Sequence, residues 1–354
     1  SSSPKTSISP TSTISSCGAD VSDTAVLRHY LAPILPLLEP VEVTELVINK
    51  PGEVGIEDHQ GWHWHDVAEL DSDWLATLAV AAASFTRQDV NAETPICSTI
   101  LPGGERCQIV IPSVTPSGAP SFTVRKPSRV NLAIDQLANT GLFKGTRSAA
   151  RGLGGVDAQL VAQRDAGDWP SFFRTAVAAR KNILVSGATG SGKTTFAKAL
   201  IQLIPPHERL LTIEDTRELV VEHRNVVHMV YSSERQGLAK VGPKQLLESA
   251  LRMRPDRILL QELRDGTAFF YLRNVNSGHP GSITTVHAGS AMGAFEQLTL
   301  LVKESEGGRD LARDDIRGLL RMLVDVVVQT RKHAGKFEVE EVYFDPPVGR
   351  TTAH

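Results

Sequence analysis

The chain is poor in cysteine, and its charge is nearly balanced. Three cysteines occur among 354 residues, Cys17, Cys97 and Cys107, and no two of them form a C-x-x-C pair. The sequence therefore predicts neither a disulfide framework nor a zinc site, and it favours a reducing, cytoplasmic setting. With 37 basic and 40 acidic residues, the formal net charge is −3, so the chain as a whole does not attract nucleic acid or an anionic membrane.

Long hydrophobic runs are also missing. The longest apolar stretch, "LATLAVAAASF" at residues 75–85, falls short of the roughly 18 residues that a membrane span needs. This stretch predicts a buried helix. The first residues lack the basic-then-apolar order of a secretory signal, so none is expected.

The length predicts about two domains, and composition divides the chain further. Residues 1–22 are rich in Ser, Thr and Pro and predict a disordered tail. Residues 23–126 combine amphipathic helices with short strands and predict a small α+β domain. Residues 127–169, with "KGTRSAARGLGG" at their middle, predict a linker. Residues 170–346 predict an alternation of helices and strands that forms a parallel sheet covered on both faces, and residues 347–354 predict a C-terminal tail.

A phosphate-binding pattern lies midway along the chain. "GATGSGKTT", residues 187–195, fits G-x-x-x-x-G-K-[ST] and follows the predicted strand "NILVS". In this pattern backbone N–H groups surround phosphate oxygens, the lysine reaches the outer phosphates and the hydroxyl ligates magnesium. Helical spacing then continues as far as Pro205. The predicted nucleotide-binding residues are Gly187, Thr189, Gly190, Ser191, Gly192, Lys193, Thr194 and Thr195.

Polar side chains follow three other predicted strands, "RLLTI", "RILLQ" and "SITTV". They are Glu214 with Asp215, then Glu262, then His287. Taken singly, the first two can cap a helix, Glu262 can pair with Arg264, and the histidine can bond a backbone carbonyl. Because parallel strands end along one edge of a sheet, the sequence predicts that all of them meet the phosphate loop there.

Phosphoryl transfer needs this combination, since its transition state is handled by positioning and charge neutralisation. Glu262 is the candidate to hold the magnesium shell, and Glu214 to orient or deprotonate the attacking water. His287 is the candidate to hydrogen-bond the γ-phosphate and to respond to its loss.

Four segments carry a resemblance to a known superfamily. "GATGSGKTT", "LLTIEDTRELVVEH", "LRMRPDRILLQELRDGTA" and "SGHPGSITTVHAGS" resemble the Walker A motif, Asp box, Walker B motif and His box of the secretion ATPases. Two N-terminal segments, "VTELVINKPGEV" and "GGERCQIVIPSVTPSGAPSFTVRKPS", are similar to the VirB11 branch, the traffic ATPases of bacterial type IV secretion. The resemblance covers about residues 25–343.

The resemblance implies an α/β fold with a RecA-like P-loop C-terminal domain and a smaller α+β N-terminal domain. ATP and Mg²⁺ are the implied cofactors, with Thr194 and Glu262 at the metal. It assigns catalytic roles to Glu214, Glu262 and His287, and it matches Arg106 and Arg125 to arginines that the family directs toward the phosphates. It also implies a homo-hexamer that contacts other type IV secretion components, peripherally at the cytoplasmic face of the bacterial inner membrane.

Other interpretations stay open. Gln261 stands where the family usually has Gly before the Walker B glutamate, which suggests an ATP-binding scaffold with little turnover. A pilus-type or type II secretion motor is a further alternative, although the four-cysteine module of type II motors is absent. Direct nucleic-acid binding is not expected, because the sequence has no strip of alternating aromatic and basic residues. His59, His63 and His65 lack a partner ligand at metal-binding spacing, so no metal site is expected there.

Overall fold

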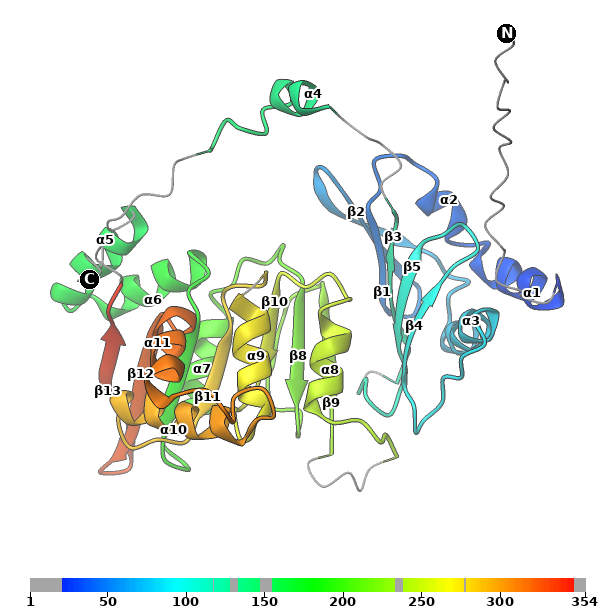
Figure 1. Cartoon of the computed structure of the whole chain (residues 1–354). Coiled ribbons are helices and arrows are strands. Elements are labelled where there is room, and N and C mark those ends of the chain that lie inside the picture. The colour runs from blue at the N-terminus through cyan, green and yellow to red at the C-terminus, as the bar shows by residue number, and fades with distance from the viewer. Residues whose placement is uncertain are drawn as a thin grey trace, which may run out of the picture.

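The computed structural model describes residues 21–116, 118–127, 133–146, 155–232, 238–276 and 278–346. The predicted tails at residues 1–22 and 347–354 lie outside these ranges, except for the start of the first helix, α1 (Val21–Leu31). Two domains, each with its own sheet, stand side by side (Figure 1). The predicted α/β class is therefore confirmed. No helix of the described part of the chain is long and apolar enough to span a bilayer.

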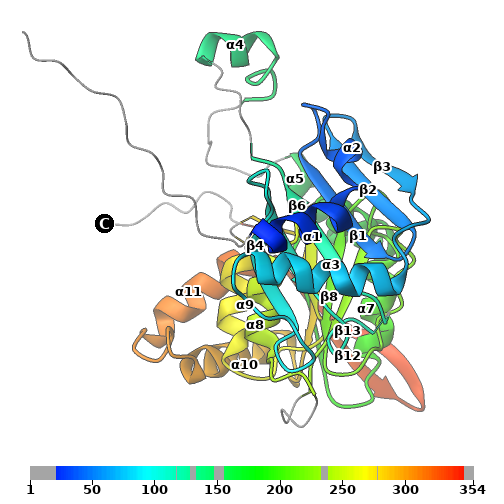
Figure 2. The same ribbon diagram turned by 90° about the vertical axis from the view of Figure 1, so that its right-hand side faces the viewer.

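The N-terminal domain is a six-stranded antiparallel sheet in the order β3-β2-β1-β6-β5-β4. Helices α1 and α3 (Ser72–Phe85) cover its outer face, away from the other domain (Figures 1 and 2). The expected helix over 75–85 is thus confirmed, and the Asp71 carboxylate caps it by accepting from the Trp74 N–H. The remaining elements are α2 (Leu35–Leu38), β1 (Glu45–Lys50), β2 (Glu53–Asp58), β3 (Gly61–Asp66), β4 (Ile96–Ile100), β5 (Arg106–Val110) and β6 (Ser121–Arg125).

The C-terminal domain has strands in the order β9-β8-β10 and β11-β7-β12-β13, joined by a parallel bridge between Glu262 and Thr285. All pairings are parallel except the closing hairpin of β12 and β13, as the sequence predicts. The strands are β7 (Ile183–Gly187), β8 (Leu210–Glu214), β9 (Val226–Val230), β10 (Arg257–Leu260), β11 (Ile283–Val286), β12 (Val326–His333) and β13 (Lys336–Phe344).

Helices cover both faces of this sheet, because alternate apolar residues of its strands point to opposite sides. Leu210 and Leu259 pack with α6 (Trp169–Ala178) and α7 (Lys193–Ile201). Leu211 and Ile258 pack with the helices of the other face. These are α8 (Pro243–Ala250), α9 (Thr267–Asn276), α10 (Ala291–Glu304) and α11 (Arg313–Leu323).

The predicted linker contains two helices within its described residues, α4 (Ile134–Asn139) and α5 (Gly155–Asp165). Helix α4 buries no residue and lies apart from both domains (Figure 1). Helix α5 packs against α6, and Leu160 is fully buried in the core below it. The structure thus places α5 with the C-terminal domain, although the weak apolar periodicity of its sequence assigned it to the linker.

A fully buried arginine joins the two domains. The guanidinium of Arg209, at the N-terminal end of β8, donates to Asn49 and Thr123 of the N-terminal domain. It also donates to Asn225 and to the carbonyl of Met253 in its own domain. Burial lowers the pKa of Arg209 to about 9. Because a buried guanidinium needs all of these acceptors, the network ties the domain interface to one geometry.

Candidate active site

The phosphate loop runs from the end of β7 at Gly187 to the start of α7 at Lys193. Gly190 and Gly192 adopt φ angles of 73° and 90°, the left-handed region that favours glycine. The Ser191 hydroxyl lies 2.9 Å from the hydroxyl of Thr330 on β12, which fixes the base of the loop to the sheet. The expected strand, loop and helix are therefore confirmed in the order that phosphate binding requires.

The Lys193 ammonium group is buried inside the loop. It donates to the carbonyl oxygens of Gly187 and Ala188, each at 3.0 Å, and lies 3.3 Å from Nδ1 of His287. Burial lowers the pKa of Lys193, while the nearby charge of Glu262 acts in the opposite direction. An ammonium has three N–H groups, and all three have acceptors within the chain. A bound phosphate must therefore take the place of one or more of them.

A chain of polar contacts continues from Lys193 along the edge of the sheet. Because the ammonium can only donate, Nδ1 of His287 accepts from it. Nε2 of His287 lies 2.7 Å from Oε1 of Glu262, although the two atoms are not in hydrogen-bonding geometry. The other carboxylate oxygen of Glu262 accepts from Nε of Arg264 at 2.5 Å. Arg264 also pairs with Asp215, at the end of β8.

The structure therefore brings Lys193, Glu262 and His287 together, as their places after neighbouring strands predict. The pairing of Glu262 with Arg264, which the sequence offered as an alternative, exists alongside this arrangement. The bond from Arg264 to Asp215 was not predicted, because the two residues lie 49 positions apart in sequence and neither motif indicates that they pair.

Glu214 is the last residue of β8, but its hydrogen-bond partners are not the residues that contact Lys193. Its carboxylate is fully buried, with Oε1 accepting from the Thr212 hydroxyl at 2.9 Å. Oε2 accepts from the backbone N–H groups of Glu218 and Leu219 at 2.8 and 2.7 Å. Burial alone raises the pKa of Glu214, but bonds from His228 and these groups outweigh it and hold the pKa below its ordinary value. The carboxylate is thus an ionised anchor for residues 215–219.

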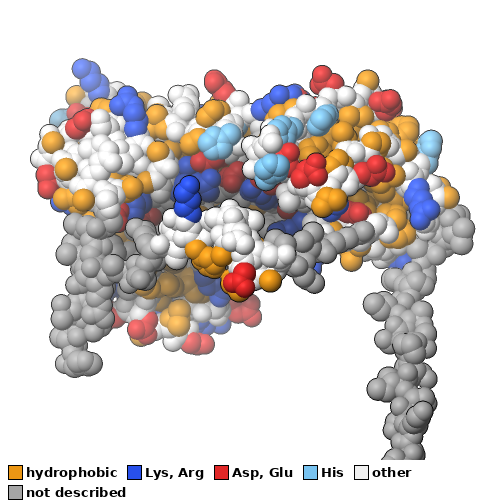
Figure 3. Space-filling view, turned by 90° about the horizontal axis from the view of Figure 1, so that it is seen from above, with side chains coloured by type: hydrophobic (Ala, Val, Ile, Leu, Met, Phe, Trp, Pro, Cys, Tyr) orange, Lys and Arg blue, Asp and Glu red, His pale blue; other side chains and the backbone are white. Residues whose placement is uncertain are grey.

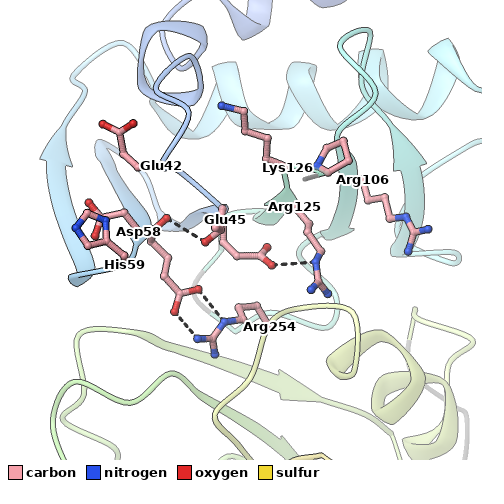
Figure 4. Close-up of a pocket in the computed structure, with 11 residues that line it drawn as sticks. Glu42, Glu45, Asp58, His59, Arg106, Arg125, Lys126 and Arg254 are labelled. Carbon is pink, nitrogen blue, oxygen red and sulfur yellow. Dashed lines mark hydrogen bonds and ion pairs between the residues drawn. The ribbon is translucent and has the colours of Figure 1, made fainter. Parts of the chain in front are cut away.

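Arg106 and Arg125 are not near the phosphate loop of the same chain. They line a cavity of about 700 Å³ between the domains, opposite Arg254 of the C-terminal domain (Figure 4). Arg254 lies shortly before the start of β10 at Arg257, so the cavity lies at the N-terminal edge of the parallel strands. The phosphate loop lies at their C-terminal edge. The arginines of the N-terminal domain therefore face one edge of the C-terminal sheet, and the phosphate loop lies at the opposite edge.

The residues present suit a magnesium ion that binds with a nucleotide. Thr194 is partly exposed at the start of α7, and the Glu262 carboxylate lies at the same edge. In the described ranges, no three histidine, cysteine or acidic side chains cluster as a metal cage. Mg²⁺ commonly binds through one or two protein oxygens together with phosphates and water, and this donor set fits that arrangement.

A phosphate loop on a RecA-like parallel sheet, with carboxylates and a histidine at neighbouring strand ends, defines a P-loop nucleotide-hydrolysing domain. Residues 160–337 match the family described as "Type II/IV secretion system protein". The chain belongs to this secretion ATPase family and, from the relatives that follow, to its VirB11 branch. It is accordingly an ATPase.

Relatives match along nearly the whole chain. The type IV secretion system protein VirB11 of Bartonella quintana is 52% identical over 333 residues, which cover 91% of this chain and 94% of the relative. VirB11 of Brucella suis is 43% identical over 338 residues, covering 94% of each. The crystal structure of the VirB11 ATPase from the Brucella suis type IV secretion system, in complex with sulphate, is 41% identical with a TM-score of 0.87. That match covers 93% of this chain and 97% of the other. The predicted family is therefore confirmed.

Proposed function

We propose that this chain forms a homo-hexamer that hydrolyses ATP to energise substrate transfer through, or assembly of, a bacterial type IV secretion system. Its place would be peripheral, at the cytoplasmic face of the inner membrane, in contact with other secretion components. The observation that carries the proposal is the connected set of Lys193, His287 and Glu262 at the phosphate loop. Relatives named as VirB11 proteins of type IV secretion systems support the same assignment.

In this proposal, the backbone of residues 187–192 and Thr195 bind the phosphates. Lys193 transfers its N–H groups from Gly187, Ala188 and His287 to phosphate oxygens. Thr194 and Glu262 hold Mg²⁺, which neutralises charge on the transferred phosphoryl group when it is bound. His287, released from the lysine, turns its Nε2–H toward the γ-phosphate and returns to Lys193 after hydrolysis.

Glu214 has the proposed task of orienting the attacking water. To do so its carboxylate must first leave Thr212, Glu218 and Leu219, all of which it contacts in this structure. That movement would release residues 215–219, including Asp215, the partner of Arg264. Hydrolysis and rearrangement of this segment are therefore coupled in the proposal.

Arg106 and Arg125 have the proposed task of contacting the nucleotide of a neighbouring subunit. Their location at the edge of the sheet opposite Lys193 excludes direct contact with the phosphates of their own chain in this geometry. An arginine supplied across an interface can stabilise a phosphoryl transition state. Each site would then be complete only in an oligomer, which supports the ring.

A mixing experiment tests this proposal with full-length protein. Lys193→Ala and Arg125→Ala subunits should each be inactive in magnesium-dependent ATP hydrolysis. Mixed together, they should regain part of the activity, because some interfaces combine an intact phosphate loop with an intact arginine. Oligomer mass should correspond to a hexamer with nucleotide. Absence of recovery, with both variants still assembling, would place the arginines in the site of their own chain.

The same assay separates the other functions. Nucleotide binding without phosphate release by the parent protein would support the scaffold interpretation that Gln261 suggests. Strong, salt-sensitive stimulation by DNA would support a nucleic-acid motor. On the described residues of the face shown in Figure 3, acidic and basic side chains are interspersed, and such a mixed surface does not favour a polyanion. No observation of this structure favours a pilus-type or type II motor over the VirB11 assignment.

A further inference from the structure

Four charged side chains form a row across neighbouring strands of the N-terminal sheet, and the proposed function uses only two of them. Glu57 on β2 stands opposite Glu45 on β1. Arg125 on β6 stands opposite both Glu45 and Arg106 of β5. Residues directly opposite each other on neighbouring strands point to the same face of a sheet. All four side chains line the cavity between the domains (Figure 4).

The two arginines of this row lie directly opposite each other. Like charges in this position are unfavourable, and an anion beside them removes the repulsion. The Arg125 side chain is 71% exposed, and its Nε lies 3.3 Å from Oε1 of Glu45. Among the residues that the structure describes, no other carboxylate forms an ion pair with Arg106 or Arg125. Glu45 therefore supplies the negative charge that Arg125 otherwise needs from a phosphate.

The two partners of this ion pair differ in their freedom to move. Glu45 is only 3% exposed, and its Oε2 has no hydrogen-bond partner within the described ranges. The neighbouring Glu57 carboxylate is already engaged, because it accepts from Nε of Arg254 at 2.7 Å and from a second nitrogen of the same guanidinium. The exposed arginine can therefore turn toward a phosphate, whereas the buried carboxylate stays beside Glu57.

We propose that Glu45 is a positioning residue for Arg125: it holds the guanidinium in the cavity until a phosphate draws it away, and it takes up a proton when the guanidinium leaves. This inference rests on the nucleotide contact proposed above for Arg125. The proton comes from solvent, and it replaces the positive charge that leaves with the guanidinium. Nucleotide binding and protonation of Glu45 are thereby linked.

The charged groups around Glu45 give this linkage its direction. Burial raises the pKa of Glu45 to about 7. Glu57 also raises this pKa, and it is lowered by Arg125, Arg254 and Arg209. Arg125 has the largest effect of these arginines, so its departure raises the pKa further. At pH 7, about half of the Glu45 side chains carry a proton before the exchange and nearly all carry one after it, an uptake of roughly half a proton per chain.

Calorimetric titration of the full-length protein with Mg²⁺ and a non-hydrolysable ATP analogue measures this uptake, when it is repeated in buffers of different ionisation enthalpy. At pH 7 the parent protein should take up about half a proton more per bound nucleotide than Glu45→Gln, because the amide does not titrate. Arg125→Ala should also lack this uptake, since Glu45 then has no arginine to lose. Glu42→Gln is the matched control, because it removes an exposed carboxylate from the same cavity and should behave like the parent.

The same exchange makes nucleotide affinity depend on pH. From pH 6.5 to pH 8.5 the affinity of the parent should fall about fivefold relative to that of Glu45→Gln, because the deprotonated carboxylate competes with phosphate for Arg125. Comparing the two proteins at each pH cancels the ionisation of the nucleotide itself.

Equal proton uptake by the parent, Glu45→Gln and Arg125→Ala would overturn the inference. A ratio of affinities between the parent and Glu45→Gln that stayed constant with pH would also overturn it, because Glu45 would then have only a structural role. These two results leave the proposed function intact if Arg125→Ala is still defective in ATP hydrolysis. Hydrolysis by Arg125→Ala at the parent rate would instead refute the proposed nucleotide contact of Arg125, and this inference with it.

Discussion

The buried carboxylate of Glu214 has structural contacts and a proposed catalytic task, and one substitution tests both. Glu214→Gln keeps the size of the side chain but removes its charge. The amide oxygen of glutamine can still accept from the N–H groups of Glu218 and Leu219, and the Thr212 hydroxyl can turn to accept from the new NH₂ group. What is lost is the ionic character of the hydrogen bonds to Oε1 and Oε2.

The expected loss follows from the strength of those bonds. Hydrogen bonds to a charged group contribute about 1.5–3 kcal/mol each, against about 0.5–1.5 kcal/mol for neutral ones. Part of this loss of hydrogen-bond free energy is offset, because burying a neutral glutamine amide costs less free energy than burying a carboxylate. We therefore expect Glu214→Gln to lower the free energy of unfolding by about 2 kcal/mol at pH 7, or roughly 4–8 °C in Tm.

The pH dependence has a definite sign. The folded state holds the pKa of Glu214 below its ordinary value, so its stabilisation is complete above the ordinary pKa and is lost as pH falls through the lowered one. The difference between the parent and Glu214→Gln should therefore be constant near neutral pH and shrink only in acid.

Urea denaturation followed by circular dichroism measures this difference, with phosphate release assayed on the same samples. Glu218→Gln serves as the control, because that neighbouring side chain is exposed. If Glu214→Gln abolished hydrolysis with no change in stability, the carboxylate would not anchor residues 215–219, and the reasoning from its contacts would be refuted.

Three other perturbations test different parts of the molecule. His287→Ala should reduce steady-state phosphate release by roughly 10²-fold but leave ADP affinity in a binding titration nearly unchanged; equal losses in both would contradict a role confined to the γ-phosphate. Burial raises the pKa of Glu45 to about 7, although Arg125 acts in the opposite direction. The protonated form of Glu45 therefore stabilises the folded state, and this stabilisation is lost as pH rises through that value. Glu45→Gln should therefore exceed the parent in unfolding free energy by about 2–3 kcal/mol at pH 8 and match it near pH 4; urea midpoints that differ equally at both pH values would argue against this. Arg209→Lys, which loses the guanidinium contacts across the domain interface, should cost about 3 kcal/mol in urea denaturation; a loss no larger than that of exposed Arg217→Lys would show that the buried network is dispensable.

Local patterns in the sequence predicted most of the catalytic edge. The phosphate loop is readable because glycine spacing, Lys193 and Thr194 act within a few consecutive residues. Apolar runs predicted the strands, and the common direction of parallel strands predicted that Glu262 and His287 lie near that loop. These inferences need only chain order and the geometry of a parallel sheet.

Other features depend on how distant segments pack. The alternation of side chains along β8 predicts on which face of the sheet Glu214 lies. It does not predict that the N–H groups of Glu218 and Leu219, in the turn after β8, donate to its carboxylate. Arg264 meets Asp215 only because β10 pairs with β8. Helix α5 joins the C-terminal core through the buried Leu160 and the partly buried Val161, two neighbouring residues that give too weak a helical pattern to recognise.

The sequence by itself determined the class of the protein, the phosphate loop and the polar residues at the strand ends, because each is set by short-range spacing. Tertiary structure alone decided that Arg106 and Arg125 face the edge opposite Lys193, since the domain interface built around Arg209 sets that arrangement. It also decided that Phe337 rests on Gly192, because the pairing of β12 with β7 brings the hairpin to the loop.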